Sequence, residues 1–292
     1  MSTELKPTQE PKLQGDLSVT ALYTAGVWKW AGFQGADLLA TEDTQRVFNF
    51  TNAALALMRL YRWTLPRLAE GLAQRHTLID QLTEEYTPSV ILELASGLST
   101  RSQRMCDSTH LVNLQRYIEI DLPHVIQYKN DQLNRQEAVP NQLSLKGQDL
   151  KNLNAHDLAE LLQEVHQPVI IAEGLLMYLK IEETETLLQV IASQLMKTGG
   201  RLIFDWVPTV EQLRPGILGR ILGLIMRIFT GGESFQRDER TRDDMQQLLH
   251  RLGAKDVSLF DTKQVAEERH LPFAHVHTQQ LIFCADFSSA PS

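Results

Sequence analysis

Three acidic residues stand directly after short apolar runs, which are typical of buried strands. They are Asp121, Asp149 and Glu173. In an open α/β sheet, ligands bind beyond the carboxyl ends of the strands, where the strand order reverses. A carboxylate at such an end can accept hydrogen bonds from hydroxyl or amino groups, and it can balance a positive charge. The pattern therefore predicts a ligand site at one edge of a sheet.

A turn of small residues, Ala95-Ser96-Gly97, follows the first predicted strand. Glycine lets the backbone approach a ligand closely, although Ala95 stands where the G-x-G-x-x-G motif of dinucleotide enzymes needs a glycine. Asp121 follows the turn at roughly the 20-residue distance at which an acidic residue binds ribose hydroxyls. An ordinary strand-to-helix connection and a helix N-cap are the alternatives. The turn and Asp121 together favour a nucleoside ligand.

The other two acidic residues extend this site. Asp149 could accept an adenine amino group, with Leu150 covering the ring, or it could cap a helix. Glu173 lies beside Gly174 and should point into the cleft, where it would suit a bound cation. Tyr178 could offer an aromatic face to the same cation, or it could be an ordinary core residue.

The elements that must position these residues alternate between strands and helices. Five apolar runs predict strands at 90–94, 116–120, 143–146, 168–172 and 201–206. Helices are expected at 182–196 and 242–252, and two late strands near 257–260 and 279–284. Such alternation predicts an α/β fold with a mostly parallel, Rossmann-like sheet. The two late strands indicate a hairpin-like edge.

The rest of the chain divides into three further segments. Residues 1–15 are polar and are predicted to be a disordered tail. Residues 16–87 are predicted to form a helical cap or lid. Its clearest helix covers 51–72, with an end or a kink at Pro66. The sheet domain should cover residues 88–288, with a helical insertion at about 208–240. Within it, the apolar stretch 216–229 is too short to span a membrane, so an amphipathic helix over a pocket is favoured over a membrane-surface helix.

Composition limits the partners. The chain has 292 residues and a formal net charge of −8, which argues against nucleic acid and anionic membranes. Cys106 and Cys284 are far apart and lack the spacing of metal ligands, so we assign no metal and expect a cytoplasmic protein. The apolar residues within 217–226 suit an apolar small-molecule substrate or a homodimer contact equally well.

Four stretches together resemble the leucine carboxyl methyltransferase family of class I S-adenosylmethionine (SAM)-dependent methyltransferases, which includes bacterial natural-product enzymes. They are ILELASGLSTR, YIEIDLPHVIQYK, IIAEGLLMYL and, more loosely, RLIFDWVP. The resemblance implies SAM as cofactor. It also implies a bacterial enzyme of specialised metabolism that acts on a small carboxylate or hydroxyl acceptor.

By this resemblance, Gly97 approaches the methionine part of SAM, Asp121 holds the ribose, and Asp149 with Leu150 holds the adenine. Glu173 lines the methionine end, and Tyr178 faces the reacting centre. Arg75 occupies the position of the arginine that grips the SAM carboxylate. Arg101 matches the family's Thr-Arg pair, with a structural salt bridge as its alternative. Glu93 and Leu122 flank these motifs and complete the predicted cofactor site.

The N-terminal helices cap the active site in this family, and residues 20–35 are rich in aromatic side chains. Tyr23, Trp28 and Trp30 could form a lid that excludes water and surrounds a sulfonium, although plain packing also explains them. Two other uses of SAM remain open. The chain could cyclise SAM to azetidine-2-carboxylate and methylthioadenosine, because no convincing general base is visible. It could also bind SAM without turnover.

Overall fold

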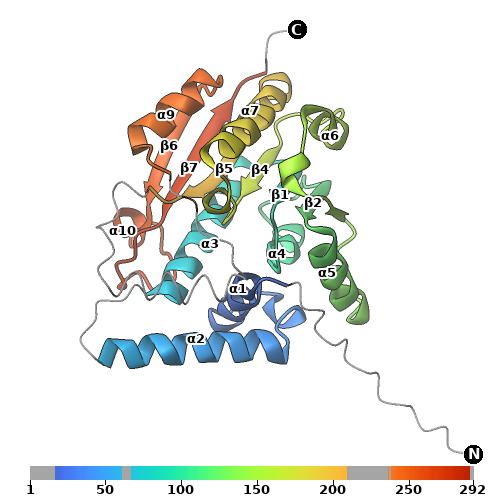
Figure 1. The fold of residues 1–292 in the computed structure, drawn as a ribbon. Coiled ribbons are helices and arrows are strands. Elements are labelled where there is room, and N and C mark those ends of the chain that lie inside the picture. The colour runs from blue at the N-terminus through green and yellow to red at the C-terminus, as the bar shows by residue number, and fades with distance from the viewer. Residues whose placement is uncertain (1–16, 61–66, 209–235, 237, 290–292) are drawn as a thin grey trace, which may run out of the picture.

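The computed structural model describes residues 17–60, 67–208, 236 and 238–289, and their strands form one sheet with helices on both faces (Figure 1). The strands are β1 (Val90–Leu94), β2 (Arg116–Asp121), β3 (Leu143–Gly147), β4 (Val169–Ala172), β5 (Gly200–Trp206), β6 (Asp256–Asp261) and β7 (Leu281–Phe287). The α-helices of these residues are α1 (Val19–Trp30), α2 (Glu42–Leu60), α3 (Leu68–Tyr86), α4 (Arg101–Asp107), α5 (Pro123–Arg135), α6 (Ala155–Leu161), α7 (Ile181–Thr198), α9 (Arg242–Arg251) and α10 (Thr262–Val265). Short 3-10 helices are η1 (Ala36–Leu38), η2 (Leu150–Asn152) and η3 (Leu176–Tyr178).

The seven strands lie in the order β3-β2-β1-β4-β5-β7-β6. Strands β1 to β5 pair in parallel, whereas β7 runs antiparallel to both β5 and β6. After β3 the chain returns to the other side of β1, so the strand order reverses between β1 and β4. Ligands of open α/β sheets bind at the carboxyl ends of the strands beside such a reversal. The predicted Rossmann-like, mostly parallel sheet is confirmed.

Alternating side chains of the strands build two cores, one on each face of the sheet. Leu92 of β1 packs in one core with Leu188 of α7 and Met245 of α9. Its neighbour Ile91 packs in the opposite core with Ile79 of α3. Because both faces are covered, the central strands are apolar throughout, and the carboxyl ends of the strands are the place where polar side chains can gather.

Helices α1 and α2 lie together at one end of the molecule, and α3 runs from them toward the sheet (Figure 1). The close contact between α1 and α2 depends on Gly26, where an added β-carbon would stand 2.5 Å from the β-carbon of Phe48. Leu22 of α1 also belongs to a buried cluster with Leu98 and with Leu133 of α5. The N-terminal helices therefore touch the turn that follows β1.

The structure confirms most of the predicted elements to within two residues. The last strand is an exception, because it covers Leu281–Phe287 and not 279–284. Gln279 and Gln280 form a corner instead, where they donate hydrogen bonds to Asp261 and Thr262. The strand then continues past Cys284 because the pairing with β5 extends to Phe287.

The predicted helix over 51–72 is wrong at its start, since α2 begins at Glu42; within the described residues α2 covers Glu42–Leu60 and α3 covers Leu68–Tyr86. Pro66, the tail at 1–15 and nearly all of the insertion at 208–240, including its apolar stretch 216–229, lie outside the described residues. Within the described part of the chain, no helix is long and apolar enough to cross a membrane.

Candidate active site

The turn after β1 exposes backbone to the carboxyl edge of the sheet. Ala95 and Gly97 both have positive φ angles, of 54° and 53°. A β-carbon added to Gly97 would meet no protein atom within 4 Å among the described residues, so this backbone borders open space. The Ser96 hydroxyl beside it is buried without a hydrogen-bond partner in the described part of the chain. A bare backbone next to an unsatisfied hydroxyl fits the approach of a polar ligand.

Asp121 closes β2 and holds this turn. Its carboxylate accepts from the backbone N–H of Gly97 and from that of Leu122, both at 2.7 Å. The N-cap of α5 is Leu122, so Asp121 does not serve as the helix cap. Burial raises the pKa of Asp121, and the two backbone donors oppose that rise. Each carboxylate oxygen keeps a second lone pair, which a ribose hydroxyl could use.

A buried ion pair on β2 and α5 holds the end of this turn in place. Lys129 of α5 has no exposed surface and donates to the carboxylate of Glu119 and to the carbonyl oxygen of Ser99. The carbonyl contact ties the end of the turn to α5. The position of the turn thus depends on a charge pair inside the protein.

The predicted adenine-binding residues lie at the end of β3. Asp149 caps the short helix η2 by accepting from the backbone N–H of Lys151 at 3.0 Å. Leu150 is half-buried against the core, and Leu122 is 40% exposed. Exposed leucine surface of this kind suits a flat ring, but the adenine assignment stays a prediction.

Glu173 follows β4 and meets Arg75 of α3. The Arg75 Nε donates to Glu173 at 2.9 Å, and its Nη1 donates to Asp205 of β5 at 2.7 Å. Asp205 also accepts from the backbone N–H of Gly174, whose φ is +68°. Arg75 therefore joins the ends of β4 and β5, and part of its hydrogen-bonding capacity is already used by the protein.

The electrostatics keep Glu173 ionised. Burial alone would raise its pKa, but the hydrogen bond from His76 and the positive charges of Arg101 and Arg75 together hold that pKa well below its usual range. Burial likewise works to lower the pKa of Arg75, and Asp205, Glu173 and Tyr178 outweigh it. Tyr178, at the end of the half-turn η3, is thus near enough to influence the Arg75 guanidinium. A fixed negative charge beside an aromatic ring can stabilise a cation.

Arg101, the first residue of α4, has no exposed surface. Its Nε donates to Asp80 at 2.6 Å, and its two terminal nitrogens donate to Glu93 and Glu173. Glu93 in turn accepts from the Tyr117 hydroxyl at 2.6 Å. Both Arg101 and Glu93 are therefore held in a structural ion network, and whether either also contacts the cofactor stays a prediction.

The predicted lid residues each stack on a different ring. Tyr23 stacks on Phe48 with ring centroids 5.8 Å apart. Trp28 is buried and stacks on His76 at 4.0 Å. Trp30 is 43% exposed and stacks on Phe273 at 4.7 Å. Trp28 alone of these three stacks on a residue bonded to Glu173, and the role of all three as a lid stays a prediction.

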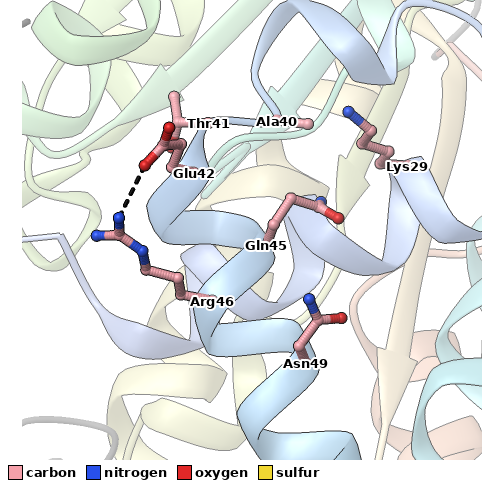
Figure 2. A pocket seen from close by; sticks show the side chains of 7 residues that line it. All are labelled: Lys29, Ala40, Thr41, Glu42, Gln45, Arg46 and Asn49. Atoms are coloured by element: carbon pink, nitrogen blue, oxygen red, sulfur yellow. Dashed lines mark hydrogen bonds and ion pairs between the residues drawn. The ribbon is translucent and has the colours of Figure 1, made fainter.

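Two surface hollows lie outside the predicted cofactor residues. One, of about 340 Å³, lies beside α2, where Glu42 and Arg46 form an ion pair at 2.8 Å (Figure 2). The other, of about 430 Å³, is lined by residues of α3, α4 and the segment after α1, including Asp80 and Arg104. The second hollow therefore borders the outer members of the ion network.

Four members of this network were not among the residues assigned from the sequence: His76, Asp80, Arg104 and Asp205. Asp205 carried the clearest available indication, because it follows the apolar residues Leu202–Phe204 of β5 and a buried charge needs a partner. His76 and Asp80 lie in the same stretch as Arg75, but their partners come from distant parts of the chain.

A sequence profile of the leucine carboxyl methyltransferase family matches residues 32–192, more than half of the chain. The chain belongs to the leucine carboxyl methyltransferase family. It is therefore a SAM-dependent methyltransferase. The match includes the turn after β1, Asp121, Glu173 and the ion network on α3 and α4.

Solved structures share the fold at low sequence identity. A methyltransferase candidate from Thermobifida fusca is 14% identical with a TM-score of 0.60, and the alignment covers 95% of this chain and 98% of that one. An exported-protein candidate from Bordetella parapertussis is 13% identical with a TM-score of 0.54, covering 92% and 95%. No curated protein sequence matches the chain.

Proposed function

We propose that the enzyme binds SAM across the carboxyl ends of β1, β2 and β4 and transfers its methyl group to a small molecule bearing a carboxylate or a hydroxyl group. One observation carries this proposal. The open backbone at Gly97 lies between Asp121, which has acceptor capacity left for a ribose, and the next strand end, where Glu173 meets Arg75. A nucleoside that bears a charged amino-acid chain would match these groups in this spatial order.

The protein's contribution to the reaction is mainly orientation. SAM supplies a methyl group on a positively charged sulfur, and that charge is lost when the methyl group leaves. Asp121 fixes the nucleoside end, while the Glu173 carboxylate and the Tyr178 ring would hold the cationic end in place. The buried ion network holds Glu173, and the backbone N–H groups of Gly97 and Leu122 hold Asp121. Both carboxylates are thus in position before any ligand arrives, which is the condition for effective electrostatic stabilisation.

The acceptor class determines whether the enzyme needs a base. A carboxylate is already ionised near neutral pH and needs none, whereas a hydroxyl must lose a proton to a positioned group. His76 is a poor base for that purpose, since burial lowers its pKa to about 4 and both of its ring nitrogens have protein partners. The ion network therefore supports carboxylate acceptors more directly than hydroxyl acceptors.

The first experiment incubates the purified enzyme with SAM alone and identifies the products by mass spectrometry. The expected result is intact SAM, followed by S-adenosylhomocysteine (SAH) once a small carboxylic acid from a panel is accepted. Methylthioadenosine with a product of azetidine-2-carboxylate mass would replace methyl transfer by cyclisation. SAM binding without turnover on either a carboxylate or a hydroxyl panel would contradict the proposed acceptor class. The Asp121→Ala variant serves as the control that separates turnover at this site from contamination.

A further inference from the structure

His76 stands next to Arg75 on α3, has no exposed surface and has partners on both ring nitrogens. The Nδ1 lies 2.9 Å from the Glu173 Oε2 and 2.8 Å from the Arg101 Nη2, and the Nε2 lies 2.5 Å from the Arg104 Nη2. A guanidinium can only donate, and among the described residues Nε2 faces only that of Arg104, so Nε2 must accept. The single proton of the neutral ring therefore belongs on Nδ1, where Glu173 is an acceptor, and the nearby Arg101 Nη2 donates to Glu173 as well. His76 then donates to the Glu173 carboxylate while it accepts from Arg104.

This arrangement requires a neutral imidazole. Burial and the positive charge of Arg101 together lower the pKa of His76 to about 4, because Glu173 and Asp80 only partly offset these two effects. A proton on Nε2 would point at the Arg104 guanidinium and remove the acceptor. Near neutral pH the ring is therefore a fixed link between a carboxylate and a guanidinium.

Aromatic residues of the N-terminal helices hold the plane of the ring. Trp28 of α1 stacks on His76 with centroids 4.0 Å apart and planes 21° apart. Phe33 meets the ring edge-on at 5.1 Å, and the Arg104 guanidinium lies 4.8 Å over the same Phe33 ring. The α1 segment thus contacts Glu173 through His76, and a ring so clamped has little freedom to choose another hydrogen-bond direction.

We propose that His76 is a positioning residue of the SAM site that orients the Glu173 carboxylate, and that this orientation depends on the packing of Trp28 against His76. The inference rests on the proposed placement of the SAM sulfonium near Glu173. It assigns to α1 an effect on cofactor binding that needs no direct contact between α1 and the cofactor. A histidine that merely fills the core would not change the preference of the site for a cationic ligand, whereas a positioning residue would.

Two near-isosteric variants separate the two ring nitrogens. In His76→Asn the side-chain amide can take the place of Nδ1 and still donate to Glu173. In His76→Gln the amide reaches the position of Nε2, and the donor to Glu173 is lost. Calorimetry with SAM, which is cationic at sulfur, and with SAH, which is neutral there, measures whether Glu173 is still aimed at the charge. The ratio of the two affinities is the readout, because a general loss of packing weakens both ligands alike.

We expect His76→Gln to lower the ratio of SAM to SAH affinity by about ten-fold, the size of one lost hydrogen bond to a charged group. His76→Asn should keep the ratio within about three-fold of the wild type. Trp28→Leu should shift the ratio in the same direction as His76→Gln, whereas Trp28→Phe, which keeps an aromatic face, should not. Circular dichroism confirms that each variant is folded.

An unchanged ratio in both His76→Gln and Trp28→Leu would overturn the inference, and so would equal losses in the Asn and Gln variants. Failure of the proposed function looks different, because then the wild-type enzyme itself would bind neither SAM nor SAH. If Trp28→Leu does not fold, the His76 pair decides the matter alone.

Discussion

Acid should destabilise this protein through His76, which is fully buried. The pKa of His76 is lowered by burial to about 4, against 6.5 for an exposed histidine. Below about pH 6.5 the unfolded chain binds a proton that the folded protein does not, so stability is complete above that value and falls with pH. At about 1.4 kcal/mol per unit, the full loss is about 3 kcal/mol, reached near pH 4. About 2 kcal/mol of this should appear between about pH 7 and about pH 5.

The assay is urea unfolding of the wild type and of His76→Asn across this range. Asparagine does not titrate, so the variant lacks the His76 contribution, while the other eight histidines are present in both proteins. The variant starts from a lower stability, and the comparison therefore uses the slope of stability against pH. We expect the wild type to lose about 2 kcal/mol more than the variant between about pH 7 and about pH 5.

Parallel pH profiles of the two proteins would refute the reasoning, because they would mean that His76 has the same pKa in the folded and unfolded states. Nuclear magnetic resonance of the imidazole protons offers an independent check. A His76 titration midpoint near 6.5 would show that the ring is reached by water and does not accept from Arg104.

Three other substitutions address the turn and its support. Asp121→Ala should raise the SAM dissociation constant by about five- to 150-fold, the equivalent of 1–3 kcal/mol, and unchanged affinity in calorimetry would exclude the ribose role. Gly97→Ala puts a β-carbon on a backbone with φ +53°, which should lower the free energy of unfolding in urea by about 1 kcal/mol. The loss of SAM-binding free energy should be larger than this, since the new carbon points into the open space beside the turn. Lys129→Met leaves the Glu119 charge buried without its partner and should lower the free energy of unfolding by about 3–5 kcal/mol. The double variant Lys129→Met with Glu119→Leu should recover most of that loss. No recovery would contradict the pairing.

The fold could be predicted from sequence because its determinants are local. The run at 90–94 is apolar at nearly every position, as a strand covered on both faces must be, and the structure places β1 at those residues. The final strand was misplaced because its limits depend on distant partners. The predicted strand stops at residue 284, yet β7 continues past it by pairing with β5, and Asp286 accepts a hydrogen bond from Arg201 of β5 at 2.7 Å.

The site residues divide in the same way. Gly97 and Asp121 could be assigned from their places after strands, and the structure joins them by a direct hydrogen bond. The partners of Arg75 could not be assigned, since the nearer of them, Glu173, is 98 positions away in the chain. No periodicity encodes which buried charge meets which, because the choice depends on how α3 packs against the sheet.

The charge of the ion network should affect the binding of SAM and of SAH differently. Three guanidinium groups, of Arg75, Arg101 and Arg104, meet four carboxyl groups, of Asp80, Glu93, Glu173 and Asp205. The balance leaves a negative excess when all seven are ionised, and SAM carries a positive excess at sulfur. Methyl transfer removes that positive charge, so the product faces a site whose negative charge is no longer balanced. Arg75, already shared between two carboxylates, is then better placed to keep those charges fixed than to serve as a dedicated clamp for the ligand carboxylate. With SAM placed as proposed, the same network would orient the cation and would thereby favour release of the neutral product.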